Sequence, residues 1–171
     1  MLCDPRELLV YAVLDALEIP YERFTHGPAM TMEDCAVFDA GRDAAHCKNL
    51  FLSNRQGTQF YLLLVVGEKP FVTKDISRQL GVSRLSFGTP EQLQNTLGVL
   101  PGAVTPMGLV HACAKDVHVV LDRELSGWER VIVHPNVNTA SIVLKTKDLL
   151  RFLAARGNTL TYVTVQAGEA T

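Results

Sequence analysis

Two segments decide the fold of this chain: His46-Cys47-Lys48-Asn49-Leu50-Phe51-Leu52 and Tyr61-Leu62-Leu63-Leu64-Val65-Val66. Between them lies Ser53-Asn54-Arg55-Gln56-Gly57, whose composition is typical of a turn. We therefore predict a hairpin of strands near 46–53 and 59–66. The second strand is apolar on both faces, which indicates a covered strand at the centre of a sheet.

Lys48 is the unusual residue of this hairpin. The alternation of side chains along a strand places it on the same face as Leu50 and Leu52. An ammonium group on such a face must find a carboxylate, reach water or wait for an anionic ligand. Two interpretations stay open on this pattern alone: a lysine whose side chain extends to water at the sheet edge, and a lysine that binds a ligand.

The rest of the chain alternates helix and strand signals. Asp4-Pro5-Arg6-Glu7 has the residues of a capped helix start and predicts a helix over 5–18, with an apolar stripe formed by Leu8, Leu9, Ala12, Val13, Ala16 and Leu17. Further helices are predicted from Thr31 to near Gly41 and, each with a threonine cap, over Thr73–Leu80, Thr89–Leu97 and Thr146–Arg156. Strands are predicted near 21–26, 84–87, 108–113, 117–122, 130–133, 139–145 and 159–165.

This order of elements predicts an α+β fold. Strands in neighbouring hairpin-like runs, interleaved with helices, favour a central mixed, mainly antiparallel β-sheet flanked by helices, and strict βαβ alternation is absent. For a chain of 171 residues we expect a single compact domain over 1–171.

Composition and charge narrow the function classes. A net charge of −2 argues against a broad basic surface for duplex DNA, so we do not expect DNA as a partner. A local basic cluster remains, which is either a solvated helix face or a contact for tRNA: Lys69, Lys74, Arg78 and Arg84. The sequence has no run long enough to span a bilayer and no signal-peptide pattern, so we expect no membrane association and a cytoplasmic location.

The four cysteines show neither a disulfide framework nor a Cys-x-x-Cys metal motif. His46-Cys47 and His111-Ala112-Cys113 could meet around zinc, but adjacent and alternate residues seldom give tetrahedral geometry without other ligands. Glycine-rich nucleotide loops are also absent from the sequence. We therefore expect no metal and no cofactor.

Two further segments suggest a binding site. Leu100-Pro101-Gly102-Ala103-Val104-Thr105-Pro106-Met107-Gly108 predicts a rigid loop that either presents backbone groups to a ligand or connects a helix to a strand. Val131-Ile132-Val133-His134-Pro135-Asn136-Val137-Asn138 predicts a strand that ends in a histidine and a turn. His134 could bind a polar substrate or cap the turn.

Taken together, Lys48 in a strand, the Gly102-x-x-x-Pro106 loop and His134-Pro135-Asn136 resemble the YbaK/ProX aminoacyl-tRNA deacylase family. The similarity extends from Pro28-Ala29-Met30-Thr31-Met32-Glu33 to the final strand. Within the family, the runs Lys48–Leu52 and His134–Asn138 are most similar to the free-standing prolyl-tRNA editing branch, which removes alanine mischarged on the proline tRNA.

The resemblance implies a mixed sheet with a central cleft, metal-free hydrolysis of an aminoacyl ester, tRNA with a proline acceptor as substrate, and transient contact with prolyl-tRNA synthetase. It implies that Lys48 is the essential lysine, which holds the terminal nucleotide or the ester. The remaining expected substrate contacts are backbone groups of Gly102, Ala103, Val104, Thr105 and Pro106, and the side chains of Asn49, His134, Met30 and Thr31.

Two other functions are compatible with parts of the sequence. Thr73–Arg84 resembles the first helix and turn of a DNA-binding helix-turn-helix, although Gly88-Thr89-Pro90 would truncate the recognition helix. A noncatalytic module that binds tRNA or a synthetase is the second alternative, and only a deacylation assay separates it from the enzyme.

Overall fold

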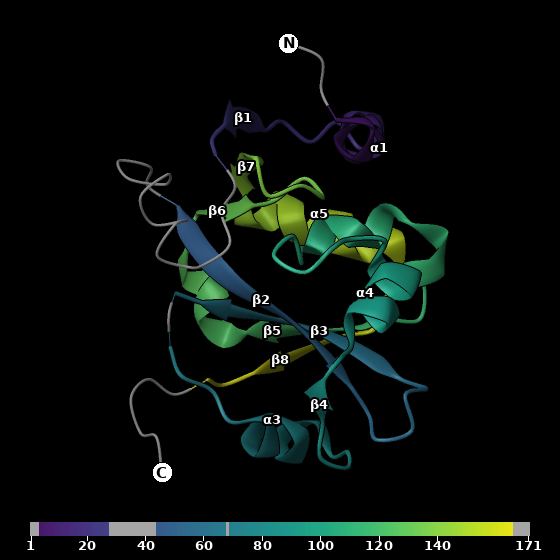
Figure 1. Ribbon diagram of the computed structural model, residues 1–171. Helices are drawn as coiled ribbons and strands as arrows, with labels where there is room; N and C mark the ends of the chain where they lie inside the picture. The colour runs from purple at the N-terminus through teal and green to yellow at the C-terminus, as the bar shows by residue number, and fades with distance from the viewer. Residues whose placement is uncertain (1–3, 28–43, 68, 166–171) are drawn as a thin grey trace.

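The computed structural model describes residues 4–27, 44–67 and 69–165 (Figure 1). The predicted helix from Thr31 to near Gly41 and the expected site residues Met30 and Thr31 lie outside these ranges. The described helices are α1 (Pro5–Ala16), α3 (Thr73–Leu80), α4 (Pro90–Leu97) and α5 (Thr146–Arg156). The described strands are β1 (Glu22–Thr25), β2 (Ala45–Ser53), β3 (Phe60–Val66), β4 (Ser86–Phe87), β5 (His118–Asp122), β6 (Arg130–Val133), β7 (Ala140–Lys145) and β8 (Leu160–Val163).

These strands form one mixed sheet in the order β1-β7-β6-β2-β3-β5-β8, and β4 pairs with β2 at its far end. Within the described residues the pairs β1–β7, β6–β7, β2–β3 and β2–β4 are antiparallel, whereas β2–β6, β3–β5 and β5–β8 are parallel. The α+β class with a mixed, mainly antiparallel sheet is therefore confirmed. The predicted hairpin is also confirmed, with Lys48 opposite Val65.

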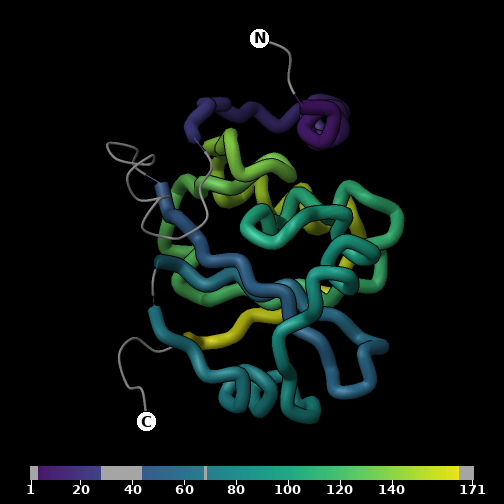
Figure 2. Tube along the Cα trace, in the orientation of Figure 1, coloured from purple at the N-terminus to yellow at the C-terminus, as the bar shows by residue number. Residues whose placement is uncertain are grey.

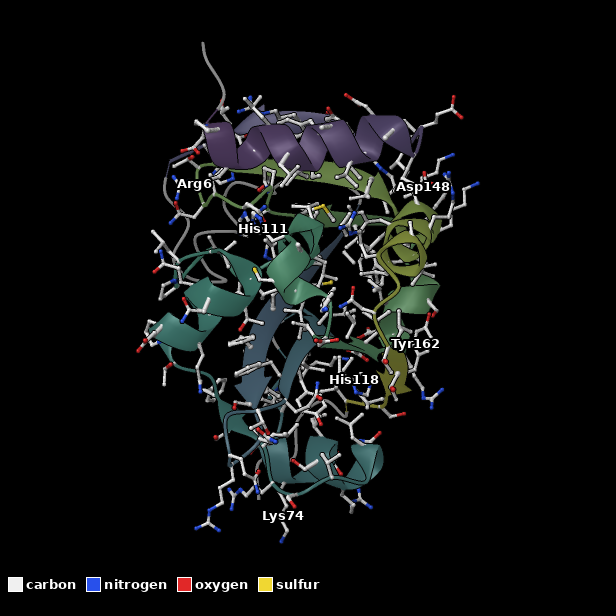
Figure 3. All side chains as sticks on the ribbon, turned by 90° about the vertical axis from the view of Figure 1, so that its right-hand side faces the viewer. Arg6, Lys74, His111, His118, Asp148 and Tyr162 are labelled. Carbon is white, nitrogen blue, oxygen red and sulfur yellow. The ribbon has the colours of Figure 1, made fainter. Side chains whose placement is uncertain are left out.

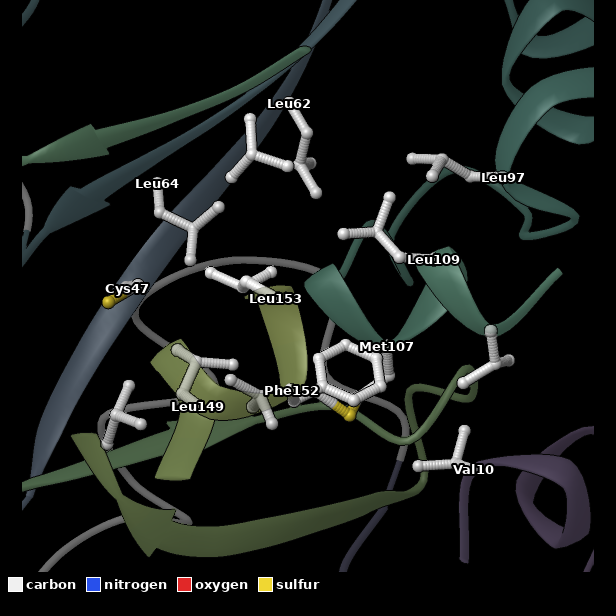
Figure 4. Packing of buried hydrophobic residues seen from close by; sticks show 14 of the residues in the cluster. Val10, Cys47, Leu62, Leu64, Leu97, Met107, Leu109, Leu149, Phe152 and Leu153 are labelled. Carbon is white, nitrogen blue, oxygen red and sulfur yellow. The ribbon is translucent and has the colours of Figure 1, made fainter. Parts of the chain in front are cut away.

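Side chains on the two faces of the sheet belong to different cores. On one face the main core packs against α1, α5 and the turns after α4, and Figure 4 shows Leu64, Met107 and Phe152 within it. On the other face, Leu52 and Val65 pack with Ile76 of α3. Figure 2 shows α1 and α3 at opposite ends of the molecule. Each face of the central hairpin is thus covered, which explains why β3 is apolar throughout.

Helix α1 begins as predicted but buries a different face. Asp4 accepts from the backbone of Arg6, and Glu7 completes the capping box. The predicted stripe is wrong at Leu8 and Leu9, which are exposed, whereas its members Val13 and Leu17 do pack against the core. The fully buried positions of the helix are Glu7, Val10, Tyr11 and Leu14. Glu7 can be buried because its carboxylate has partners in the interior. It accepts hydrogen bonds from the Tyr11 hydroxyl at 2.7 Å and from the Arg23 guanidinium at 2.9 Å. A charged residue can therefore occupy a core-facing position.

Only one of the three predicted threonine caps after residue 70 is confirmed. Thr89 caps α4, and its hydroxyl accepts from the backbone of Gln92. Helices α3 and α5 have the predicted ranges, but Thr73 and Thr146 are their first helical residues and the cap positions hold Val72 and Lys145. A threonine at the first helical position is one residue too late for its hydroxyl to serve as the cap.

The predicted strand near 108–113 is wrong. The chain instead forms two short 3-10 helices, η1 (Pro106–Val110) and η2 (Ala112–Ala114). Gly108 explains the close packing, because a Cβ built at this position would lie 3.0 Å from the carbonyl oxygen of Leu97. The apolar run is buried as a tight turn against α4, so its hydrophobicity resembles that of a strand without strand geometry.

Candidate functional site

The sheet opens along one edge of β2. Strand β6 pairs with this edge only at Ala45 and His46, and β4 pairs with it again at Leu52 and Ser53. Between these two pairings, no strand in the described part of the chain covers Cys47–Leu50. Strand β6 ends at Val133, beside this opening, so the residues that follow β6 lie near the middle of β2 (Figure 1).

Lys48 lies at this opening, and its ammonium group is held by protein atoms. Its Nζ donates a hydrogen bond to the backbone carbonyl of Lys69 at 3.1 Å. The same nitrogen lies 5.2 Å from the ring centroid of Phe71, within the range of a cation–π interaction. The side chain is half-buried. Lys48 therefore does not extend into bulk solvent.

Histidine rings from three elements meet beside this lysine. His46 precedes Lys48 by two residues on the same face of β2, a spacing of about 6.6 Å along a strand. The rings of His46 and His134 lie 6.4 Å apart, and His26, which follows β1, lies 6.2 Å from His134. The structure thus brings the predicted histidine to the strand of the predicted lysine. Sequence reasoning missed His26 and His46 as neighbours of His134, although each lies in or next to a predicted strand.

The Gly102–Pro106 loop is attached to the same place. The Thr105 hydroxyl donates to the backbone carbonyl of His134 at 2.6 Å and accepts from the backbone N–H of Met107. Thr105 is fully buried, and Gly102 has a positive φ of 89°, which favours glycine. The loop and the histidine turn are therefore joined by a buried hydrogen bond.

Two asparagines present buried amide atoms near the opening. Asn49 follows Lys48 and so points to the opposite face of β2, toward the main core. Its Oδ1 has no hydrogen-bond partner within the described residues, and the same holds for both amide atoms of Asn136. Asn136 also has a positive φ of 67°, a conformation that asparagine tolerates better than most residues. Sequence reasoning did not single out the side chain of Asn136, although the residue follows His134 within the same motif.

The four basic side chains predicted to contact tRNA differ in exposure and in ion pairing. Lys69 is enclosed: its Nζ lies 2.5 Å from Asp122 and 2.6 Å from Glu124. Arg78 pairs with Asp75 on the exposed face of α3. Lys74 and Arg84 are exposed, and Figure 3 shows Lys74 projecting from α3 at one end of the molecule.

Burial suppresses thiol chemistry at the site. Desolvation, with a smaller contribution from the nearby carboxylates of Asp122 and Glu124, raises the pKa of Cys47 to about 12. The thiol is free and buried, so it remains protonated near neutral pH. In the described ranges, no three His, Cys, Asp or Glu side chains group closely enough to hold a metal ion. A search of the same ranges finds no helix with the length and hydrophobicity needed to cross a membrane.

Comparison with known proteins is consistent with these features. The aminoacyl-tRNA editing domain matches residues 26–152. The prolyl-tRNA editing protein ProX of Acetoanaerobium sticklandii is 37% identical over 150 residues, which cover 88% of this chain and 92% of that protein. The prolyl-tRNA synthetase associated domain-containing protein 1 of Mus musculus is 33% identical over 150 residues, which cover 85% of this chain and 88% of that protein.

The fold comparison agrees with the sequence comparison. A crystal structure described as that of a candidate trans-editing enzyme for prolyl-tRNA synthetase superposes with a TM-score of 0.74, covers 98% of this chain and 100% of its own, and is 21% identical. At that identity the superposition shows the fold alone, whereas the match over residues 26–152 and the 37% identical relative identify the family. The chain belongs to the aminoacyl-tRNA editing domain family.

Proposed function

We propose that this protein is a free-standing deacylase that hydrolyses the aminoacyl ester of mischarged tRNA, with alanine on the proline tRNA as its preferred substrate. The observation that carries this proposal is the ammonium of Lys48, held at the opening of the sheet on the strand whose His46 meets His134. Family membership supports the reaction class, and the 37% identical prolyl-tRNA editing protein supports the choice of tRNA.

Lys48 supplies positive charge where the substrate is most polar. The 3′ end of a tRNA brings phosphate oxygens and an ester carbonyl, and both interact favourably with an ammonium in a sheltered site. A lysine presents this charge from a flexible stem, but contacts with Lys69 and Phe71 restrict its position. Lys48 therefore orients the terminal nucleotide or polarises the ester.

In this proposal the loop from Gly102 to Pro106 forms one wall of the pocket. Thr105 ties the loop from Gly102 to Pro106 to the backbone of His134, so backbone groups of Ala103 and Val104 can contact the aminoacyl group. His134 lines the pocket in this proposal, whereas the side chain of Asn49, also predicted as a substrate contact, points to the opposite face of β2 from Lys48. Met30 and Thr31 form the opposite wall in this proposal. A fixed wall suits a site that accepts a small side chain and rejects a larger one.

Water is the proposed nucleophile, assisted by the ribose hydroxyl of the substrate. His134 donates a hydrogen bond from Nδ1 to the backbone carbonyl of Ala140, 3.2 Å away, which fixes the orientation of its ring. The ring therefore serves as a pocket wall in this proposal, and the substrate supplies the assistance that a general base would give.

The need for such an activity follows from binding energetics. A synthetase pocket shaped for proline cannot strongly exclude alanine, because missing methylene groups change binding by only ~1–3 kcal/mol. A second site that admits alanine and excludes the proline ring restores accuracy. Transient contact with prolyl-tRNA synthetase would place that second site near newly charged tRNA.

The test is deacylation of a panel of charged tRNAs by the purified protein. Proline tRNA carrying alanine, serine, cysteine or proline is incubated with enzyme, and the remaining ester is measured over time. We expect the fastest loss for alanine and none above background for proline. Binding of every tRNA without hydrolysis would instead identify a noncatalytic tRNA-binding module.

The helix-turn-helix that suggested the DNA-binding alternative does not form in the described residues. After α3, the chain turns at Gly81 and enters β4, so the described residues place a short strand where a recognition helix would be needed.

A further inference from the structure

Lys69 connects the proposed catalytic lysine to a pair of carboxylates. Its Nζ lies 2.5 Å from Asp122 Oδ2 and 2.6 Å from Glu124 Oε2. Its backbone carbonyl accepts the hydrogen bond from Nζ of Lys48 at 3.1 Å. A single residue outside the strands thus contacts two anions through its side chain and the proposed catalytic cation through its backbone.

Asp122 is a fixed anchor for this connection. It is the last residue of β5 and is 1% exposed. Its Oδ2 also accepts from the backbone N–H of Val66, and its Oδ1 accepts from the backbone N–H of Glu124. Strand β3 separates β5 from β2, so Asp122 lies two strands from Lys48, or about 10 Å at the usual strand spacing.

Lys69 occupies both carboxylates through its side chain. Burial on its own would lower the pKa of Lys69, but hydrogen bonds to Asp122 and Glu124 raise it overall, so this lysine stays charged. The side chain of Lys69 is only 15% exposed, which makes it a poor surface contact for tRNA. Its charge neutralises a buried anion, and its backbone is held where Lys48 can reach it.

Resting on the proposed role of Lys48 in deacylation, we propose that Lys69 is a positioning residue: its ion pairs with Asp122 and Glu124 fix the carbonyl that orients the Lys48 ammonium. Lys69 does not contact substrate. Its effect therefore falls on the rate of the chemical step, and tRNA binding is unchanged. A surface role in tRNA binding would produce the opposite pattern.

The first measurement compares Lys69→Met with Lys147→Met, a change at an exposed lysine on α5. Single-turnover deacylation of proline tRNA charged with alanine is followed at several enzyme concentrations. We expect Lys69→Met to lower the maximal rate about 10- to 100-fold, as misplacement of a reacting group does. The enzyme concentration that gives half the maximal rate should stay within twofold of the wild-type value. Lys69→Arg, which retains the charge, should recover most of the rate. A higher enzyme concentration at half the maximal rate, with the maximal rate unchanged, would overturn the proposal.

The second measurement reports on Lys48 without activity. Acetic anhydride at limiting concentration labels lysine amines, and mass spectrometry gives the labelling rate of Lys48 relative to Lys147 in each folded variant. We expect Lys69→Met to increase the relative rate of Lys48 at least threefold, because its ammonium is no longer held. An unchanged rate in a variant with wild-type circular dichroism would contradict the proposal even if deacylation fell.

The two measurements separate the two proposals. If Lys69→Met exposes Lys48 to labelling while the wild-type protein hydrolyses none of the charged tRNAs, the positioning contact exists and the proposed function fails. If Lys69→Met does not fold, Glu124→Gln replaces it. Glu124 is half-exposed, and this substitution removes one of the two ion pairs of Lys69. The expected increase in Lys48 labelling is then about twofold, and no increase would overturn the proposal.

Discussion

A lysine on an apolar sheet face must replace its hydration with other contacts, and Lys48 does so with a carbonyl oxygen and an aromatic ring. A cation–π contact of this kind contributes ~0.5–1 kcal/mol at exposed sites and ~2 kcal/mol when desolvated. Both partners lie in the segment between β3 and α3. The half-buried ammonium stays available to a ligand because neither contact neutralises its charge.

Thr105 is the residue whose loss should loosen the pocket most selectively. Thr105→Val keeps the shape but removes the hydroxyl that donates to His134 and accepts from Met107. A buried carbonyl left without its donor costs ~1–3 kcal/mol. We expect that loss in the free energy of unfolding, measured by urea denaturation, and a fall in kcat/KM of tenfold or more. Thr105→Ser should behave as wild type in both measurements, and a Thr105→Val variant with unchanged stability would contradict the role assigned to this hydroxyl.

The sequence identified single residues that break a local pattern but not their partners. Lys48 was predictable because a charge interrupts an alternating apolar strand. The contact between Thr105 and His134 spans 29 residues, and no local signal encodes it. Lys69 was predicted as part of a surface cluster because its neighbours in sequence are basic, whereas Asp122, its partner, lies 53 positions away.

Among the elements, α1 offers a direct test of helix capping. Hydrogen bonds from the Arg6 side chain and backbone lower the pKa of Asp4 to about 2, below its usual value of 3.8. A lowered pKa in the folded state stabilises the protein above pH 3.8, and that contribution is lost as the pH falls from about 4 to 2. Asp4→Asn retains a good cap but does not titrate.

We therefore expect the difference in unfolding free energy between wild type and Asp4→Asn to change in favour of the asparagine variant as the pH falls from 4 to 2. Asp4→Ala should cost ~1 kcal/mol at neutral pH. Thermal unfolding monitored by circular dichroism across this pH range measures both effects. A difference independent of pH would show that the Asp4 carboxylate does not stabilise the helix.

Predictions of the elements succeeded where a local signal determines geometry. The central hairpin follows from alternation in β2 and from the continuous apolar run of β3. Helices α3 and α5 have the predicted ranges, and Gly81 and Gly157 end them. The region after Pro106 could not be predicted because its apolar run is equally compatible with a strand and a buried turn. Only the close approach of Gly108 to α4 decides between them, and that contact is tertiary.

Charge over the surface as a whole predicts how tRNA approaches. The net charge is −2, so attraction must come from local groups. Lys74 and Arg84 are exposed at the α3 end of the molecule, on the side of the sheet that carries Lys48. Arg78 is a weaker candidate, since Asp75 already pairs with it.

If Lys74 and Arg84 contact phosphates, replacing either by alanine should raise the KM for charged tRNA a few-fold and leave kcat unchanged. Each lost contact should also reduce the slope of log affinity against log salt by ~0.7, the value for a single strand. Measurements of KM between 50 and 200 mM salt test this, with Lys147→Ala as the control. Identical slopes for all variants would place the tRNA elsewhere.

The arrangement of the sheet explains why the site forms where it does. Strand β2 pairs with β6 at one end and with β4 at the other, so among the described strands none pairs with its middle along that edge. The loops after α4 and β6 are joined at that opening by Thr105 and His134. Segments from distant parts of the chain therefore converge on Lys48, and this convergence could not be read from the sequence alone.

Single-turnover deacylation of proline tRNA charged with alanine, measured for Lys48→Ala, tests the role of this lysine most directly. Wild type and Lys147→Ala should hydrolyse the ester at the same rate, while Lys48→Ala should be slower by about 100-fold or more, the usual cost of removing a group that stabilises a developing charge. Circular dichroism should show the same fold for all three proteins. A folded Lys48→Ala protein that hydrolyses the ester at the wild-type rate would contradict this role.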